Sequence, residues 1–163
     1  MCYNVNMKDL HIHTIYSDGE YDEYKIIDEI QKSQVKEFAI CDHDTLEGSR
    51  RVFELLQKKG TDLIFHPGVE LTCRYKEYGN GINMHILVQD FDYEDKNLQD
   101  IVKEISSLRK KKIDRMIKFI QKEFDISIPL ALVEEKASKT FSFGKPHMYS
   151  ILTTISNITR EEY

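Results

Sequence analysis

The first third of the chain alternates short apolar runs with amphipathic stretches. The pattern predicts strands at 3–12, 35–41 and 62–72 and a helix at 21–33. A second helix should begin with Thr45 as its N-cap and end before Gly60. Strands that alternate with helices are typical of parallel sheets. We therefore expect an α/β fold. Its third strand should break at Pro67-Gly68, and a hairpin should pair 71–75 with 82–88.

The pattern becomes helical from Tyr93 onward. Apolar residues that recur at helical spacing predict one long helix: Leu98, Ile101, Val102, Ile105, Leu108, Ile113, Met116, Ile117, Ile120 and Phe124. A short helix is expected from Pro129 to Lys136, and a last one from Lys145 to a polar tail at 159–163. We therefore divide the chain into an α/β part, 1–92, and a helical insertion or cap subdomain, 93–163.

Composition narrows the class of protein. The 163 residues carry 23 basic and 28 acidic side chains, a net charge of −5, so a surface that coats nucleic acid broadly is not expected. This length suits one globular domain, and no apolar run approaches the roughly 20 residues of a membrane span. The three cysteines form no CxxC pair, which favours reduced thiols and a cytoplasmic location.

Two histidines share one face of the first expected strand. His11 and His13 are separated by one residue, and alternate side chains of a strand point the same way. They can therefore bind one metal ion, with Asp9 before them and Asp18 on the following loop. An exposed histidine pair without a metal is the alternative interpretation.

A second cluster, Asp42, His43 and Asp44, directly follows the apolar run of the second strand. Two carboxylates beside an imidazole suit either metal ligation or the orientation of a ligating histidine from its outer side. Simple helix capping is the alternative for Asp44 and Thr45.

Two further polar residues interrupt strand patterns. Glu70 stands in an otherwise apolar strand, where burial without a partner would be costly and a metal ion would stabilise it. His85 lies inside the run 82–88, and a hydrogen-bonded core histidine is its alternative interpretation. We interpret His66, which precedes Pro67 at the outer end of its strand, as structural or peripheral.

The basic residues of the helical part offer contacts for an anion. His147 follows a glycine turn and opens the last helix, where the helix dipole and Lys145 would attract a phosphate. It is open whether His147 is a metal ligand, a phosphate contact or an ordinary turn histidine. Arg109 and Arg115 could hold a second phosphate, although the run 109–112 is more typical of a solvated helix face.

These motifs, in this order, resemble the polymerase and histidinol phosphatase (PHP) domain superfamily of metal-dependent phosphoesterases. The run 9–14 with 17–19 resembles the first family motif, 42–45 the second and 67–70 the third, and His85 follows at the expected place. The helical insertion and the turn 144–147 are similar to the branch of nucleoside 3',5'-bisphosphate phosphatases and a 5'-to-3' exoribonuclease. The resemblance implies the N-terminal part of a distorted (β/α)7 barrel. The chain departs from the family at Cys41, Val88 and Lys145, where threonine, glycine and arginine are usual.

The resemblance also implies divalent transition metals, namely manganese, zinc or iron. His11 and His13 would hold one ion, Glu70 would bridge it to a second that takes His85 and His147, and Asp18 with His43 would start a third. Asp9, Asp42 and Asp44 would support these ligands from outside. The resemblance covers about the first half of a family domain. The late histidine and aspartate ligands have no counterpart after Asp125 and His147, so we expect fewer than three ions.

The implied function is hydrolysis of a phosphomonoester, of a nucleotide or a short oligonucleotide, by a metal-activated hydroxide. The catalytic set would be His11, His13, Asp18, His43, Glu70 and His85, and the substrate-binding set Lys145, Arg109 and Arg115. The alternative is a catalytically impaired or partner-dependent fragment that only binds metal or nucleotide. That alternative predicts exposed apolar strand edges, which a homodimer or a separate C-terminal half would cover.

Overall fold

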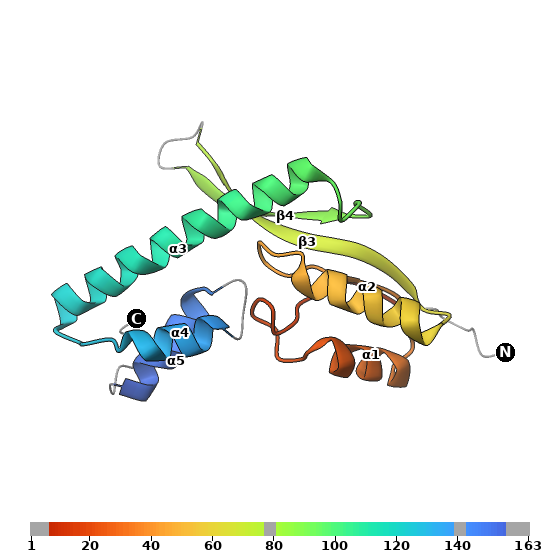
Figure 1. Cartoon of the computed structure of the whole chain (residues 1–163), viewed down its shortest axis with the longest axis horizontal. Coiled ribbons are helices and arrows are strands. Elements are labelled where there is room, and N and C mark those ends of the chain that lie inside the picture. Colours follow the sequence, from red (N-terminus) through yellow and green to blue (C-terminus); the bar gives the residue numbers. More distant parts are fainter. Residues whose placement is uncertain (1–6, 77–80, 139–142, 156–163) are drawn as a thin grey trace.

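A computed structural model of the chain describes residues 7–76, 81–138 and 143–155. Its elements are β1 Met7–Ile12, α1 Glu23–Lys32, β2 Val35–Ile40, α2 Glu47–Lys59, β3 Ile64–Tyr75, β4 Ile82–Gln89, α3 Lys96–Phe124, α4 Leu130–Ser138 and α5 Lys145–Ile155. Figure 1 shows α1 and α2 beside the sheet, and α3 leading from β4 to α4 and α5. The α/β class is confirmed.

The four strands form one sheet in the order β1-β2-β3-β4. The first three are parallel, whereas β4 runs antiparallel to β3. β3 changes partners midway, because 64–67 pair with β2 and 68–75 pair with β4. The expected break at Pro67-Gly68 is therefore wrong: one continuous strand passes from one ladder to the next. Gly68 permits this passage, since a Cβ there would lie 2.5 Å from the Ile40 carbonyl oxygen.

The expected hairpin is confirmed, with 82–89 opposite 68–75 in an antiparallel register. Three expected segments lie outside the described residues: the start of the first strand at 3–6, the turn at 77–80 and the polar tail at 159–163.

The first hydrophobic core forms between the sheet and the first two helices. Its buried residues are Ile26, Ile27, Ile30, Val35, Phe38, Ile40, Val52 and Leu56. Asp22 caps α1 by accepting from the Lys25 amide at 2.8 Å, and Gly60 ends α2 with a φ of 60°. The expected cap at Thr45 is wrong by one residue: Leu46 is the N-cap of α2, and the Thr45 hydroxyl accepts from the Glu47 amide.

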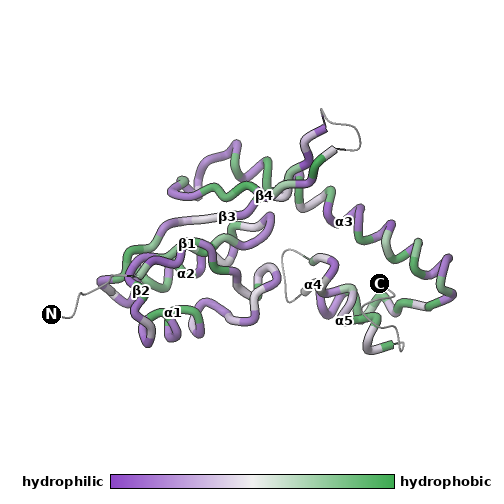
Figure 2. Tube along the Cα trace, turned by 180° about the vertical axis from the view of Figure 1, so that it is seen from behind, coloured by the Kyte–Doolittle hydropathy of each residue, from purple (hydrophilic) through white to green (hydrophobic). Residues whose placement is uncertain are grey.

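A second hydrophobic core joins α3 to α5 and to the segments beside them. Its buried members are Ile117, Ile120, Ile128, Phe143, Met148, Ile151 and Leu152. Hydrophobic positions recur between hydrophilic ones along α3 (Figure 2), as the expected stripe requires. The division at 92/93 stays a prediction. Among the described helices, none is both long and apolar enough to cross a membrane.

The start of α2 packs closely against a buried polar network. Asp42 is fully buried and accepts from the Thr14 amide at 2.8 Å, the Thr14 hydroxyl at 2.7 Å and the Ser17 hydroxyl at 2.5 Å. Gly48 of α2 faces this network, and a Cβ there would collide with Asp42 Oδ2. Only glycine therefore lets the helix approach Asp42.

We expect Gly48→Ala to lower the free energy of unfolding by about 1–3 kcal/mol, because overpacking must displace the Asp42 network. Urea denaturation measures the change. Gly60→Ala is the matched control: its Cβ would meet nothing within 4 Å, so only the positive φ costs, roughly 1 kcal/mol. An unchanged or raised stability of Gly48→Ala would contradict the packing described.

Candidate metal centre

The two histidines of the first motif point at the same place. His11 belongs to the end of β1, and His13 follows the strand by one residue. Their Nε2 atoms lie 2.9 Å apart, and their ring centroids are separated by 4.9 Å. Two imidazole nitrogens at this distance can share one proton or one metal ion.

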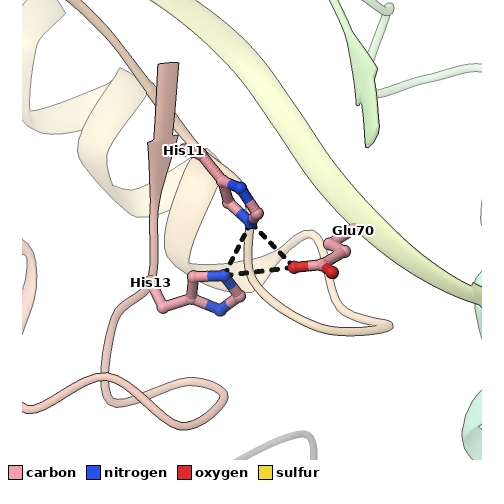
Figure 3. A group of neighbouring side chains, drawn as sticks. All are labelled: His11, His13 and Glu70. Atoms are coloured by element: carbon pink, nitrogen blue, oxygen red, sulfur yellow. Dashed lines mark hydrogen bonds and ion pairs between the residues drawn. The ribbon is translucent and has the colours of Figure 1, made fainter. Parts of the chain in front are cut away.

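Glu70 of β3 completes this convergence. Its side chain is buried, with 5% of the residue exposed. Oε2 lies 2.8 Å from Nε2 of His11 and 3.1 Å from Nε2 of His13, as the dashed lines of Figure 3 mark. Oε1 lies 2.6 Å from Nδ1 of His85, on β4. One carboxylate thus faces histidines from two sides.

His43 lies beside Glu70 because the backbone of 42–44 pairs with β3. The Glu70 amide donates to the Asp42 carbonyl at 3.1 Å, and the Asp44 amide donates to the Glu70 carbonyl at 2.9 Å. Nδ1 of His43 is 3.6 Å from Glu70 Oε2 and Nε2 is 3.5 Å from Asp18 Oδ2. Buried Nδ1 has no hydrogen-bond partner within the described part of the chain.

Six predicted residues therefore meet where β1 and β2 end and where β3 pairs with β4. Their potential ligand atoms form three groups, each within 4.8 Å: His11, His13 and Glu70; His13, Asp18 and His43; His43, Glu70 and His85. Each pair of groups shares one residue. The groups are therefore one cluster, and neighbouring ions would have to share ligands. Whether these residues act as ligands stays a prediction.

The electrostatics of the cluster favour ionised carboxylates. Hydrogen bonds from His13 and His43 hold the pKa of Asp18 well below its usual range, and Asp18 in turn raises the pKa of His13. Burial alone would raise the pKa of Glu70, yet His11, His43 and His85 outweigh it, so that its net pKa is lowered. Both carboxylates are anionic at neutral pH and suit a cation.

The three aspartates expected to support the ligands differ in what they contact. Asp42 holds the loop that carries His13 and Asp18, through its bonds to Thr14 and Ser17. Asp44 contacts β3 and α3 rather than capping α2. Asp9 is exposed, and its carboxylate accepts from the His11 amide at 3.4 Å.

A cavity of about 340 Å³ lies between the cluster and the helical part. Its walls include Asp18, His43, Asp44, Thr72 and His85 on one side, and Ile105, Leu108, Arg109, Lys112, Ile113, Met116, Phe143, Gly144, Lys145 and His147 on the other. The sequence did not single out Thr72, Lys112 or Phe143. Thr72 had a signal, because it lies two residues after Glu70 and so on the same strand face.

The predicted site residues of the helical part differ in whether they line the cavity. His147 lines the cavity, its Nδ1 accepts from the Gly144 amide at 3.1 Å, and burial lowers its pKa. It joins none of the three groups that the described residues form. Lys145 lines the cavity as well, whereas Arg115 is exposed and lies outside the set of lining residues. Arg109 bonds to Asp44 and Thr72.

The family of the chain is decided by comparison with known proteins. A family model, the PHP domain, matches residues 9–151. The chain belongs to the PHP domain family. It is 27% identical over 153 residues to a 5'-3' exoribonuclease from Haemophilus influenzae. The alignment covers 94% of this chain and 53% of that protein.

Two solved structures share the fold. A protein described as a metal-dependent phosphoesterase, from Bifidobacterium adolescentis, superposes with a TM-score of 0.75 at 23% identity, over 91% of this chain and 50% of that one. An amidohydrolase from Chromobacterium violaceum, with bound sulfate and no metal, has a TM-score of 0.74 at 20% identity, over 93% and 51%. The chain thus spans about half the length of the proteins that it matches.

His66 lies apart from this cluster of candidate ligands, as expected. Its Nδ1 is 2.7 Å from Asp90 Oδ1 and its Nε2 is 3.2 Å from Glu37 Oε1, so both ring nitrogens are engaged elsewhere. The bond to Asp90 raises the pKa of His66 above 6.5. The charged imidazole therefore stabilises the fold below pH 6.5, and this stabilisation is lost as the pH rises through the folded-state pKa.

We expect His66→Gln to destabilise the protein at pH 5.5 and to leave its stability nearly unchanged at pH 9. Chemical denaturation at the two pH values measures the difference. In an Asp90→Asn background the substitution should lose most of this pH dependence. An equal loss of stability at both pH values would contradict the ion-pair origin.

Proposed function

We propose that the chain carries the metal site of a metal-dependent phosphoesterase, which hydrolyses a phosphomonoester of a nucleotide or an oligonucleotide. The convergence of His11 Nε2, His13 Nε2 and Glu70 Oε2 at 2.8–3.1 Å carries the proposal. The family of the chain and the names of its relatives support the same class of reaction.

The residues present fit a divalent transition metal. Imidazole and carboxylate donors are the ligand set that zinc, manganese and iron accept. Buried Nδ1 of His43 is a further observation: it has no hydrogen-bond partner among the described residues, and Glu70 Oε2 lies 3.6 Å from it. A buried ring nitrogen without a hydrogen bond is costly unless a ligand binds it. A bound ion would supply an activated water near neutral pH and charge stabilisation for the phosphoryl oxygens.

The positions of the side chains suggest which residues would hold each ion. His11, His13 and Glu70 Oε2 would hold one ion, and His43, His85 and Glu70 Oε1 a second, with Glu70 as the bridge. Asp18 is left without a complete set, because His13 and His43 are already used. We therefore expect about two ions per chain rather than three.

The cavity supports an ester with an apolar or aromatic group. Its far wall offers Ile113, Met116 and Phe143 beside the cationic Lys112 and Lys145. A nucleoside matches the apolar surface, and a further phosphate matches the lysines. The 5'-3' exoribonuclease name of the Haemophilus relative is consistent with such a substrate.

Metal content and phosphate release test the proposal together. Elemental analysis should find about two transition-metal ions per chain, and nucleoside 3',5'-bisphosphate with added manganese should release phosphate. We expect His11→Ala and Glu70→Ala to lose metal and to lower the rate by about 100-fold or more. His66→Gln is the matched control and should keep both the metal content and the hydrolysis rate of the wild type. Hydrolysis at the wild-type rate by both alanine variants would place the chemistry elsewhere.

A partner-dependent protein is the second candidate, and the exposure of β4 favours it. Ile82, Met84, Ile86 and Leu87 of β4 are all exposed, although they belong to an apolar strand. β1 and β4 are the outer strands of the described sheet, so each has an edge without a strand partner there. A further polypeptide that covers them would bury these side chains.

Complementation separates the two candidates. The chain is mixed with a separately expressed segment, namely the half of the Haemophilus relative that it does not match. A partner-dependent protein gains hydrolysis and elutes as a larger complex, whereas a self-sufficient site gives the same rate with and without the segment. An Ile82→Lys/Ile86→Lys variant should lose the complex if β4 is the covered surface.

A further inference from the structure

The helical part and the sheet have separate hydrophobic cores. The first core gathers residues of α1, β2 and α2 with neighbours such as Phe65, and the second gathers residues from Ile113 onward. Within the described residues, no apolar cluster contains members of both. A shared apolar core therefore does not fix α3 over the cluster of candidate ligands, which leaves a role for polar contacts between the two parts.

Arg109 makes such a contact from the inner side of α3. It occupies the apolar stripe, four residues after Ile105 and four before Ile113. Its side chain is 21% exposed, whereas the neighbouring Lys110 is exposed. Arg109 donates to the Thr72 hydroxyl at 3.1 Å and to Asp44 Oδ2. The interpretation of 109–112 as a solvated face is therefore wrong for Arg109.

Asp44 needs this cation. The residue is only 2% exposed, and its Oδ1 accepts from the Thr72 amide at 2.7 Å while Oδ2 accepts from the Thr72 hydroxyl at 2.8 Å. A buried carboxylate without an opposite charge is strongly unfavourable. Asp44 also has a φ of 54°, so its backbone is held in the left-handed region that few residues other than glycine adopt.

The contact between Arg109 and Asp44 involves the same backbone segment that positions His43. The Asp44 amide bonds to the Glu70 carbonyl, and Thr72 follows Glu70 on the same face of β3. The cavity has walls from both parts, with His43 and His85 on one side and Met116 and Phe143 on the other. Seating α3 on Asp44 and Thr72 thus closes the cavity over the cluster.

We propose that Arg109 is a positioning residue: its bonds to Asp44 and Thr72 seat the helical part over the cluster of candidate metal ligands and shape the substrate cavity. This replaces the expectation that Arg109 binds a substrate phosphate. The statement about the substrate rests on the proposed function, whereas the statement about seating does not.

Thermal unfolding of the chain without substrate tests the pairing. Arg109→Ala should lower the melting temperature by about 5–10 °C, because it leaves Asp44 buried and unpaired. Adding Asp44→Asn removes that charge, so the double variant should be more stable than Arg109→Ala alone. Lys110→Ala, on the exposed side of the same helix, is the control and should change little. A double variant that loses the sum of both single effects would overturn the pairing.

Hydrogen–deuterium exchange without substrate tests the seating. Peptides that cover 68–76 and 102–112 should exchange about tenfold faster in Arg109→Ala than in the wild type, while peptides of α1 stay unchanged. Arg109→Lys keeps the charge but loses the planar fork, and it should restore part of the protection. It also reports on the contact if Arg109→Ala does not fold. Unchanged exchange in both peptides would overturn the proposal.

Kinetics distinguish positioning from direct substrate binding. For a positioning residue, Arg109→Ala and Asp44→Asn raise KM for the nucleoside bisphosphate by similar factors, and the double variant raises it no further. If Arg109 bound the phosphate itself, only Arg109→Ala would raise KM, and the proposal would fall. If wild type releases no phosphate, the proposed function fails, and the unfolding and exchange results still decide the seating.

Discussion

The structure depends on one buried carboxylate, that of Glu70. An anion in the interior is tolerated only where opposite charge or hydrogen-bond donors surround it. Here Oε2 faces His11 and His13, and Oε1 faces His85. The backbone of Glu70 is held as well, by Asp42 on one side and Asp44 on the other. β1, the loop after β2, and β4 must therefore meet at a single residue of β3.

β3 can pair with β2, with β4 and with the loop 42–44 because it changes partners at Pro67-Gly68. Its first residues belong to the parallel ladder with β2, and its later ones to the hairpin with β4. Glu70 lies just past this change, where the backbone of 42–44 still reaches the strand. Asp42 and Asp44 then stabilise different parts of the structure around Glu70. Asp42 orders the loop of His13 and Asp18, and burial raises its pKa, whereas Asp44 ties β3 to α3.

The same sheet leaves much of its apolar surface uncovered. β4 exposes Ile82, Met84, Ile86 and Leu87, although burial of such side chains is the main source of stability in a domain. The chain also spans about half the length of its relatives. The same molecule thus combines a cluster of candidate metal ligands with outer strands that lack a strand partner in the described part of the chain, and this is why its function is proposed in two forms.

Local periodicity determined a large part of this outcome from the sequence alone. The spacing of His11 and His13, the isolated Glu70 and the stripe of α3 all follow from which face of a strand or helix a residue occupies. The ordered motifs indicated the PHP domain family, which the match over 9–151 shows. Contacts between distant segments were beyond this reasoning. Only the tertiary structure paired Arg109 with Asp44, placed His147 outside the three groups of potential ligand atoms and carried β3 through Pro67-Gly68. The physical reason is that periodicity specifies which side chains share a face, whereas the packing of separate elements decides what that face meets.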